Sequence, residues 1–257
     1  MVVKCGTAGS KTRGNAVTEH EWQNCDDPVI VMCGLKGRIS DRKCRLFDLA
    51  CADGLSAFWT DQVCRRFARL MRDEIDADND DADDEIDSLA DRINELARSK
   101  WQKAAALFAA RRSVDAEMTE AIKSYAAVGL LEALHGSMEW WYWLNEYTEV
   151  STPENLDQAF QTFSLSYYRS RLPLLRCIVG NPFRRDTIDP SWLTWNDRTV
   201  PKLARRIYDE DRFDLMPILG DALEDAHCNH AEFLTHCREG APHVRGCWVV
   251  DLILDKK

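Results

Sequence analysis

The sequence lacks the features that mark a membrane protein or a small disulfide-rich scaffold. No apolar run approaches the roughly 20 residues of a membrane-spanning helix, and the most hydrophobic stretch, residues 247–254, has about half that length. There is no CxxC pair, we expect no signal peptide, and a chain of 257 residues is long enough to bury a core without disulfides. We therefore expect a cytoplasmic location in which the ten cysteines stay reduced.

Common catalytic motifs are also absent from the sequence. It contains no G-x-S-x-G nucleophile turn, no HExxH zinc motif and no glycine-rich phosphate loop after a strand. These absences exclude the hydrolases, zinc proteases and nucleotide-binding enzymes that carry such motifs. An enzyme of unrecognised type, with a cleft near residues 189–197, stays open as an alternative.

Basic residues are fewer than acidic residues in this chain. The chain has 33 basic against 43 acidic residues and a net charge of −10, which disfavours a nucleic acid or an anionic membrane surface as partner. Its 45% hydrophobic and 30% charged residues are ordinary for a folded globular protein. We therefore expect a protein partner, no nucleic acid and no membrane.

Helix signals are present along the chain. Thr18 and Glu21 form a capping box, Asp27-Pro28 is a cap followed by proline in the first turn, and apolar residues recur at helical spacing over residues 86–108. The only strand-like run, Trp248 to Val250, has no second run to pair with. The sequence predicts an all-α, multi-helix globular bundle.

Two irregularities are expected within this bundle. The helix that begins near residue 153 should break near Pro173, because proline lacks an amide proton and clashes with the preceding turn. Residues 180–200 are rich in tryptophan and predict an ordered loop packed on the helices. A last helix is predicted from Pro242 to Leu254.

The domain organisation follows from the composition. Residues 1–16 have no periodicity and predict a flexible lead-in. An N-terminal helical half is predicted over residues 17–150 and a C-terminal helical half over residues 151–257. The alternative is that the two halves form one continuous domain. The well-formed capping box beside Val17 leads us to expect that native translation starts near that residue.

Several strings in the chain carry a resemblance to other proteins. They are TEHEW and SDRKCRLF near the N-terminus and, in the C-terminal third, NPF, DPSWLTWND, KLARRIYDEDRFDLMPILGDALEDA and HVRGCWVVDLIL. In these strings the chain resembles a family of uncharacterised helical proteins of planctomycete bacteria. The resemblance implies a shared helical fold and a bacterial source, and it implies no activity.

Histidine and cysteine gather near the C-terminus. The pattern suggests a zinc site whose ligands are spread over residues 228–247, namely Cys228, Cys237, His243 and Cys247. His243 and Cys247, four residues apart, would share one face of the predicted last helix. The spacing matches no common zinc module, which favours the alternative that these cysteines are reduced, metal-free and packed against Trp248.

The acidic stretch of residues 76–87 has oxygen ligands at alternate positions, as in a calcium loop. Asp81 stands where that motif needs glycine, and Asp87 stands where it needs a bidentate glutamate. We therefore predict a solvated loop that does not bind calcium.

Tryptophans offer a possible partner or ligand surface. They occur in two groups, Trp140, Trp141 and Trp143 in one and Trp192 and Trp195 in the other. Because the chain has much apolar helix surface and no catalytic constellation, the leading hypothesis is a helical protein-interaction or regulatory module. A zinc-stabilised protein is the second hypothesis, and the enzyme of unrecognised type is the third.

Overall fold

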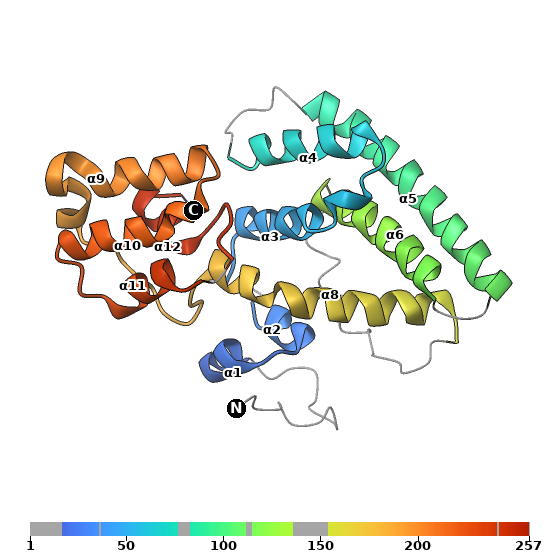
Figure 1. The fold of residues 1–257 in the computed structure, drawn as a ribbon, viewed down its shortest axis with the longest axis horizontal. Coiled ribbons are helices and arrows are strands. Elements are labelled where there is room, and N and C mark those ends of the chain that lie inside the picture. The colour runs from blue at the N-terminus through green and yellow to red at the C-terminus, as the bar shows by residue number, and fades with distance from the viewer. Residues whose placement is uncertain are drawn as a thin grey trace. The chain divides into compact units, whose positions relative to one another are not determined.

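The structure is a computed structural model that describes residues 17–35, 37–76, 83–111, 115–135, 154–240 and 242–256. Over these ranges the regular elements are α-helices and short 3-10 helices, with no strand (Figure 1). This confirms the predicted all-α class. The lead-in, the central part of the acidic stretch and position 150 lie outside the described residues. None of the described helices is long and apolar enough to cross a membrane.

The helices have the following bounds in chain order. The first seven are α1 (Glu19–Asn24), α2 (Pro28–Cys33), α3 (Asp41–Asp53), α4 (Gln62–Glu74), α5 (Asp83–Arg111), α6 (Ala116–His135) and α8 (Leu156–Val179). The last four are α9 (Pro190–Asp209), α10 (Met216–Asp225), α11 (Ala231–Arg238) and α12 (Trp248–Leu254). Two 3-10 turns, Ser56–Phe58 and Phe213–Leu215, precede α4 and α10.

Short polar side chains fix where the helices begin. The side chain of Thr18 accepts from the amide of Glu21 while Glu21 accepts from the amide of Thr18, so the predicted capping box is confirmed. Asp27 caps α2 ahead of Pro28, and Asp61 caps α4 by accepting from the amide of Val63.

The chain divides into two compact units. The N-terminal unit contains Met1–Lys36 and Cys44–Leu172, and the C-terminal unit contains Gly37–Lys43 and Pro173–Lys257. The boundaries fall inside α3 and α8, so each of these helices contributes residues to both units. The C-terminal unit is therefore discontinuous in sequence, because it takes seven residues from the N-terminal part of the chain.

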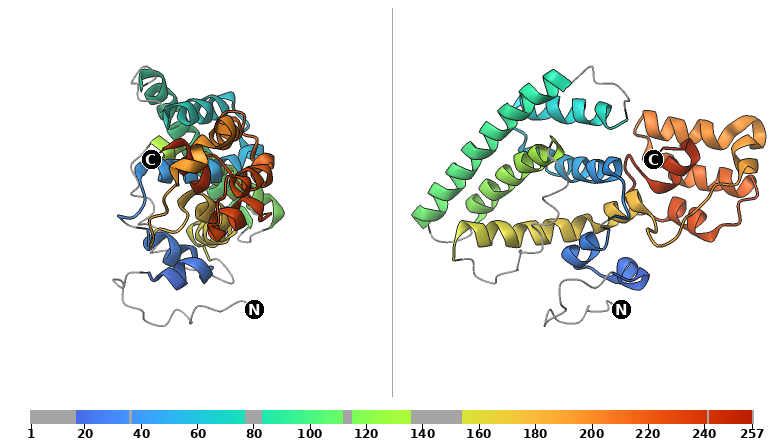
Figure 2. Two further views of the ribbon diagram at one scale, coloured as in Figure 1. Left: turned by 90° about the vertical axis from the view of Figure 1, so that its left-hand side faces the viewer. Right: turned by 180° about the vertical axis from the view of Figure 1, so that it is seen from behind.

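Long helices build the N-terminal unit. In Figures 1 and 2, α5 and α6 lie side by side, and α4 contacts both of them. Trp101, Tyr125 and Phe160 form an aromatic cluster, with ring centroids 4.8 Å apart for the first two and 5.1 Å for the last two. Aromatic packing of this kind gives the long helices a defined contact.

Short helices and an aromatic core build the C-terminal unit. Helices α9, α10, α11 and α12, orange to red in Figure 1, share one core of buried residues. Phe233 lies between Trp192 and Trp248, with ring centroids at 5.8 and 4.8 Å. These rings position α11 against α12.

The structure corrects three expectations. The prediction of a helix break near Pro173 is wrong, since α8 continues through that residue to Val179. The predicted last helix is too long, because α12 begins only at Trp248 and Gly246 before it has a φ of 88°. The tryptophan-rich segment is only partly a loop: Trp192 lies in α9, and the helical geometry is interrupted over residues 195–198.

Candidate metal centre

Cys177 is placed by the end of α8. The helix ends at Val179, and Gly180 follows with a φ of 69°, the left-handed conformation that favours glycine. A Cβ at Gly180 would lie 2.9 Å from Cγ of Trp248, so the absence of a side chain there allows close approach to the start of α12. Cys177 itself is buried, with 1% of its surface exposed.

His236 is placed by the helical phase of α11. Successive residues of an α-helix point about 100° apart, so His236 and Cys237 face different neighbours. The Cβ of Cys237 lies 3.0 Å from the position of a Cβ at Gly220 in α10, whereas the ring of His236 packs 4.8 Å from the ring of His243. Only the histidine of this pair faces the centre.

His243 and Cys247 come from the non-helical segment before α12. The amide of Cys247 donates to the carbonyl of Val244 at 3.0 Å, which makes a tight turn with Gly246 at positive φ. This turn, not a shared helix face, brings the two side chains together. Arg245, within the turn, points to the ring of Tyr208, with 4.7 Å from its guanidinium carbon to the ring centroid.

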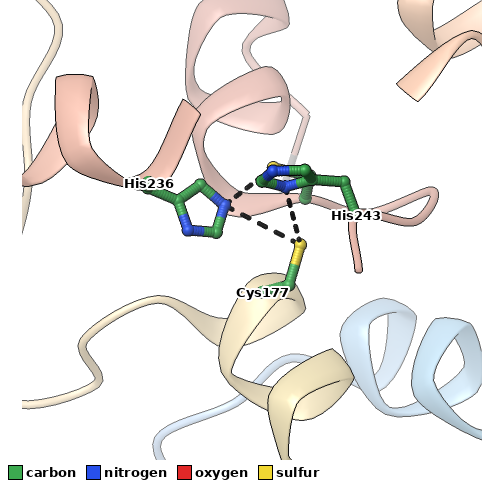
Figure 3. A group of neighbouring side chains, drawn as sticks. Cys177, His236 and His243 are labelled. Carbon is green, nitrogen blue, oxygen red and sulfur yellow. Dashed lines mark hydrogen bonds between the residues drawn. The ribbon is translucent and has the colours of Figure 1, made fainter. Parts of the chain in front are cut away.

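The four side chains converge on one point, and Figure 3 shows three of them, Cys177, His236 and His243. The sulfur of Cys177 lies 3.6 Å from Nδ1 of His243 and 3.7 Å from Nε2 of His236, and Nε2 of His236 lies 3.2 Å from the sulfur of Cys247. All four potential ligand atoms lie within 4.8 Å of one another. A tetrahedral zinc ion with Zn–S of about 2.3 Å and Zn–N of about 2.0–2.1 Å needs sulfur–nitrogen separations of about 3.6 Å. These three sulfur–nitrogen separations are therefore close to those of a tetrahedral site.

The two sulfurs differ in electrostatic environment. The hydrogen bond with Cys247 raises the pKa of Cys177, and burial raises it further. Burial also acts to raise the pKa of Cys247, but hydrogen bonds with Cys177, His236 and His243 outweigh burial and hold the pKa of Cys247 well below its usual value. The protein thus favours a thiolate at Cys247, the form in which cysteine binds metal.

The donor set determines which ion fits. Two thiolates and two imidazoles at tetrahedral spacing are typical of structural zinc, whereas calcium and magnesium prefer oxygen ligands. Four protein ligands leave no position for water or substrate, so the geometry is that of a closed site. Among the residues that the structure describes, no other group brings three or more cysteine, histidine or carboxylate ligands together.

The centre contains only two of the four residues that the sequence suggested. His243 and Cys247 belong to it, while Cys177 and His236 stand in place of Cys228 and Cys237. Cys228 and Cys237 lie buried in the apolar core. Burial raises the pKa of both thiols. His236 could have been found from its place beside Cys237, but Cys177 lies 59 residues before His236, and no spacing rule indicates it.

The other candidate residues have structural roles or lie outside the described part. Trp192 packs in the core with 8% of its surface exposed, so it cannot line a partner surface, and Trp195 is half-buried against the same core. Asp189 caps α9 through the amide of Ser191, and Asp197 pairs with Lys202. The other group of candidate surface tryptophans lies outside the described residues, namely Trp140, Trp141 and Trp143.

No protein-family model, curated protein or solved structure matches this chain. The functional argument therefore depends on the geometry of the centre.

Proposed function

We propose that the C-terminal unit is a zinc-stabilised helical module, with one structural zinc ion held by Cys177, His236, His243 and Cys247. The observation that supports this is the convergence of two sulfurs and two ring nitrogens within 4.8 Å of one another, with three sulfur–nitrogen separations of 3.2–3.7 Å that are close to the edges of a zinc tetrahedron. A reducing compartment, as the cysteine content suggests, would keep both thiols free to bind.

The ion would act as a cross-link between helices. Cys177 lies in the last turn of α8, His236 lies in the last turn of α11, and Cys247 is the residue before α12. A metal bound by all four side chains would close a chain segment of residues 177–247, and a link across a long segment removes much freedom from the unfolded chain. Short helices such as the seven-residue α12 have little stability of their own and depend on such tertiary links.

Metal analysis of the full chain, purified without a histidine tag, tests this proposal. We expect one zinc per chain in the wild type and none in Cys177→Ala or His236→Ala. The matched control is Cys237→Ala, which changes a buried cysteine beside His236 that does not face the centre. That variant should keep its zinc.

The control also separates two ligand sets. If Cys237→Ala loses the zinc while Cys177→Ala keeps it, the ion is bound by the residues suggested by sequence spacing and the observed group is not the site. If the wild type carries no zinc and takes up none from a zinc buffer, the proposal fails.

A further inference from the structure

A buried charge cluster lies next to the metal centre. Asp251 of α12 has only 2% of its side chain exposed, and Arg42 of α3 donates to its carboxylate at 2.8 Å. The other guanidinium nitrogen of Arg42 donates to the hydroxyl of Tyr208 at 2.8 Å. A buried carboxylate needs partners of this kind because the loss of hydration is costly.

Lys43 joins this cluster from the same turn of α3. Its ammonium group donates to the carbonyl of Ile178 and lies 3.7 Å from the carboxylate of Asp251. Its side chain is 17% exposed. Burial lowers the pKa of Lys43, and the negative charges of Asp251 and Cys247 oppose that change.

The two contacts of Lys43 lie beside the two cysteine ligands. Ile178 follows Cys177 directly in α8, and the amide of Asp251 donates to the carbonyl of Cys247 at 2.9 Å, one turn into α12. A single side chain therefore connects the chain at Cys177 with the helix that follows Cys247.

The charges of this cluster lie next to the two cysteine ligands. The three side chains comprise two basic groups and one carboxylate, and that carboxylate accepts hydrogen bonds from Arg42. The thiolates that bind a metal would add negative charge near this group, because the sulfurs of both Cys177 and Cys247 interact electrostatically with Lys43.

We propose that Lys43 is a positioning residue of the metal centre, which fixes the end of α8 against the start of α12 and so sets the separation of the sulfurs of Cys177 and Cys247. The proposal rests on the zinc site proposed above. It also explains why residues 37–43 belong to the C-terminal unit. Because coupling between two sites is reciprocal, bound zinc should in turn strengthen the attachment of that segment.

The zinc affinity of variants of the full chain, measured by competition with a chromophoric chelator, tests this role. Lys43→Met should weaken zinc binding by about 10–100-fold, the usual effect of removing a group that orients metal ligands. Lys43→Arg keeps the charge and donor groups and should restore most of the affinity. The matched control is Lys202→Met, which removes an exposed lysine paired with Asp197 and should bind zinc like the wild type.

The absorption spectrum of the cobalt-substituted protein separates positioning from general stability. We expect Lys43→Met to shift the cobalt d–d bands, because the sulfurs are no longer held in a tetrahedron, while Lys202→Met leaves them unchanged. If Lys43→Met does not fold, Lys43→Gln replaces it, since glutamine keeps a donor but no charge.

The outcomes distinguish the two proposals. Wild-type affinity and an unchanged cobalt spectrum in the Lys43 variants would overturn the positioning role and leave the zinc site intact. A wild type that binds neither zinc nor cobalt would overturn both.

Discussion

Buried cysteines occur in both units, but they have different neighbours. The N-terminal unit contains Cys25, Cys44, Cys51 and Cys64, and the C-terminal unit contains Cys177, Cys228, Cys237 and Cys247, all of them buried and unbridged. In the first unit burial raises the pKa of the Cys51 thiol and that of Cys64, the latter to about 11. In the second unit two sulfurs face two imidazoles. Burial alone therefore does not identify a ligand, whereas neighbouring histidines do.

The largest expected difference between the units concerns these cysteines. Cys247→Ala should remove the zinc and lower the free energy of unfolding by about 4 kcal/mol or more, because loss of a metal is among the most destabilising changes. Cys64→Ala, in the core of the N-terminal unit, should cost only about 1 kcal/mol, an ordinary value for a point substitution. Urea unfolding with metal analysis of both variants measures this. If both variants lost the same stability and Cys247→Ala kept its zinc, Cys247 would not differ from the core cysteine Cys64.

Ion pairs provide the next comparison. Asp251→Ala would leave Arg42 and Lys43 without their carboxylate in a buried place and should cost about 3–5 kcal/mol. Glu85→Ala in the N-terminal unit breaks an exposed pair with Arg66 and should cost less than about 1 kcal/mol. Both values come from urea unfolding at neutral pH. A cost for Asp251→Ala as small as that for Glu85→Ala would show that the cluster contributes little to the C-terminal unit.

The smallest expected effects, of opposite sign, concern two glycines. Gly180→Ala places a side chain at a φ of 69° and against Trp248, so it should destabilise the protein by about 1–2 kcal/mol from the backbone alone. Gly129→Ala lies in α6, where a Cβ would meet nothing within 4 Å, and should stabilise the protein by about 0.5–1 kcal/mol. Shifts of the melting temperature in opposite directions are expected. Stabilisation by Gly180→Ala would contradict the close packing described at the end of α8.

The sequence predicts the fold better than the site. Helix starts depend on contacts between residues close together in the sequence, whereas the site depends on contacts between residues far apart in it. Helix starts at Thr18, Asp27 and Asp61 follow from hydrogen bonds between residues two or three apart, which any reader of the sequence can locate. The interruption expected at Pro173 failed because packing of α8 outweighs the local cost of proline. Local signals thus predict most helices, and tertiary contacts decide the exceptions.

The metal centre shows the limit of sequence spacing. The spacing of four residues predicts that His243 and Cys247 lie together, although a turn and not a helix brings them together. The choice between His236 and Cys237 depends on the rotation of α11, which is set by its packing on α10. Cys177 joins the centre only when α8 meets α12, and no pattern within the sequence encodes that contact.

Hydrogen exchange of the zinc-loaded full chain, followed by mass spectrometry before and after removal of zinc with a chelator, tests the central claim most directly. The account predicts that peptides from residues 173–257 lose protection when the zinc is removed and regain it when zinc is restored, while peptides from α4, α5 and α6 exchange at an unchanged rate. Equal protection of the C-terminal peptides with and without the metal would contradict it.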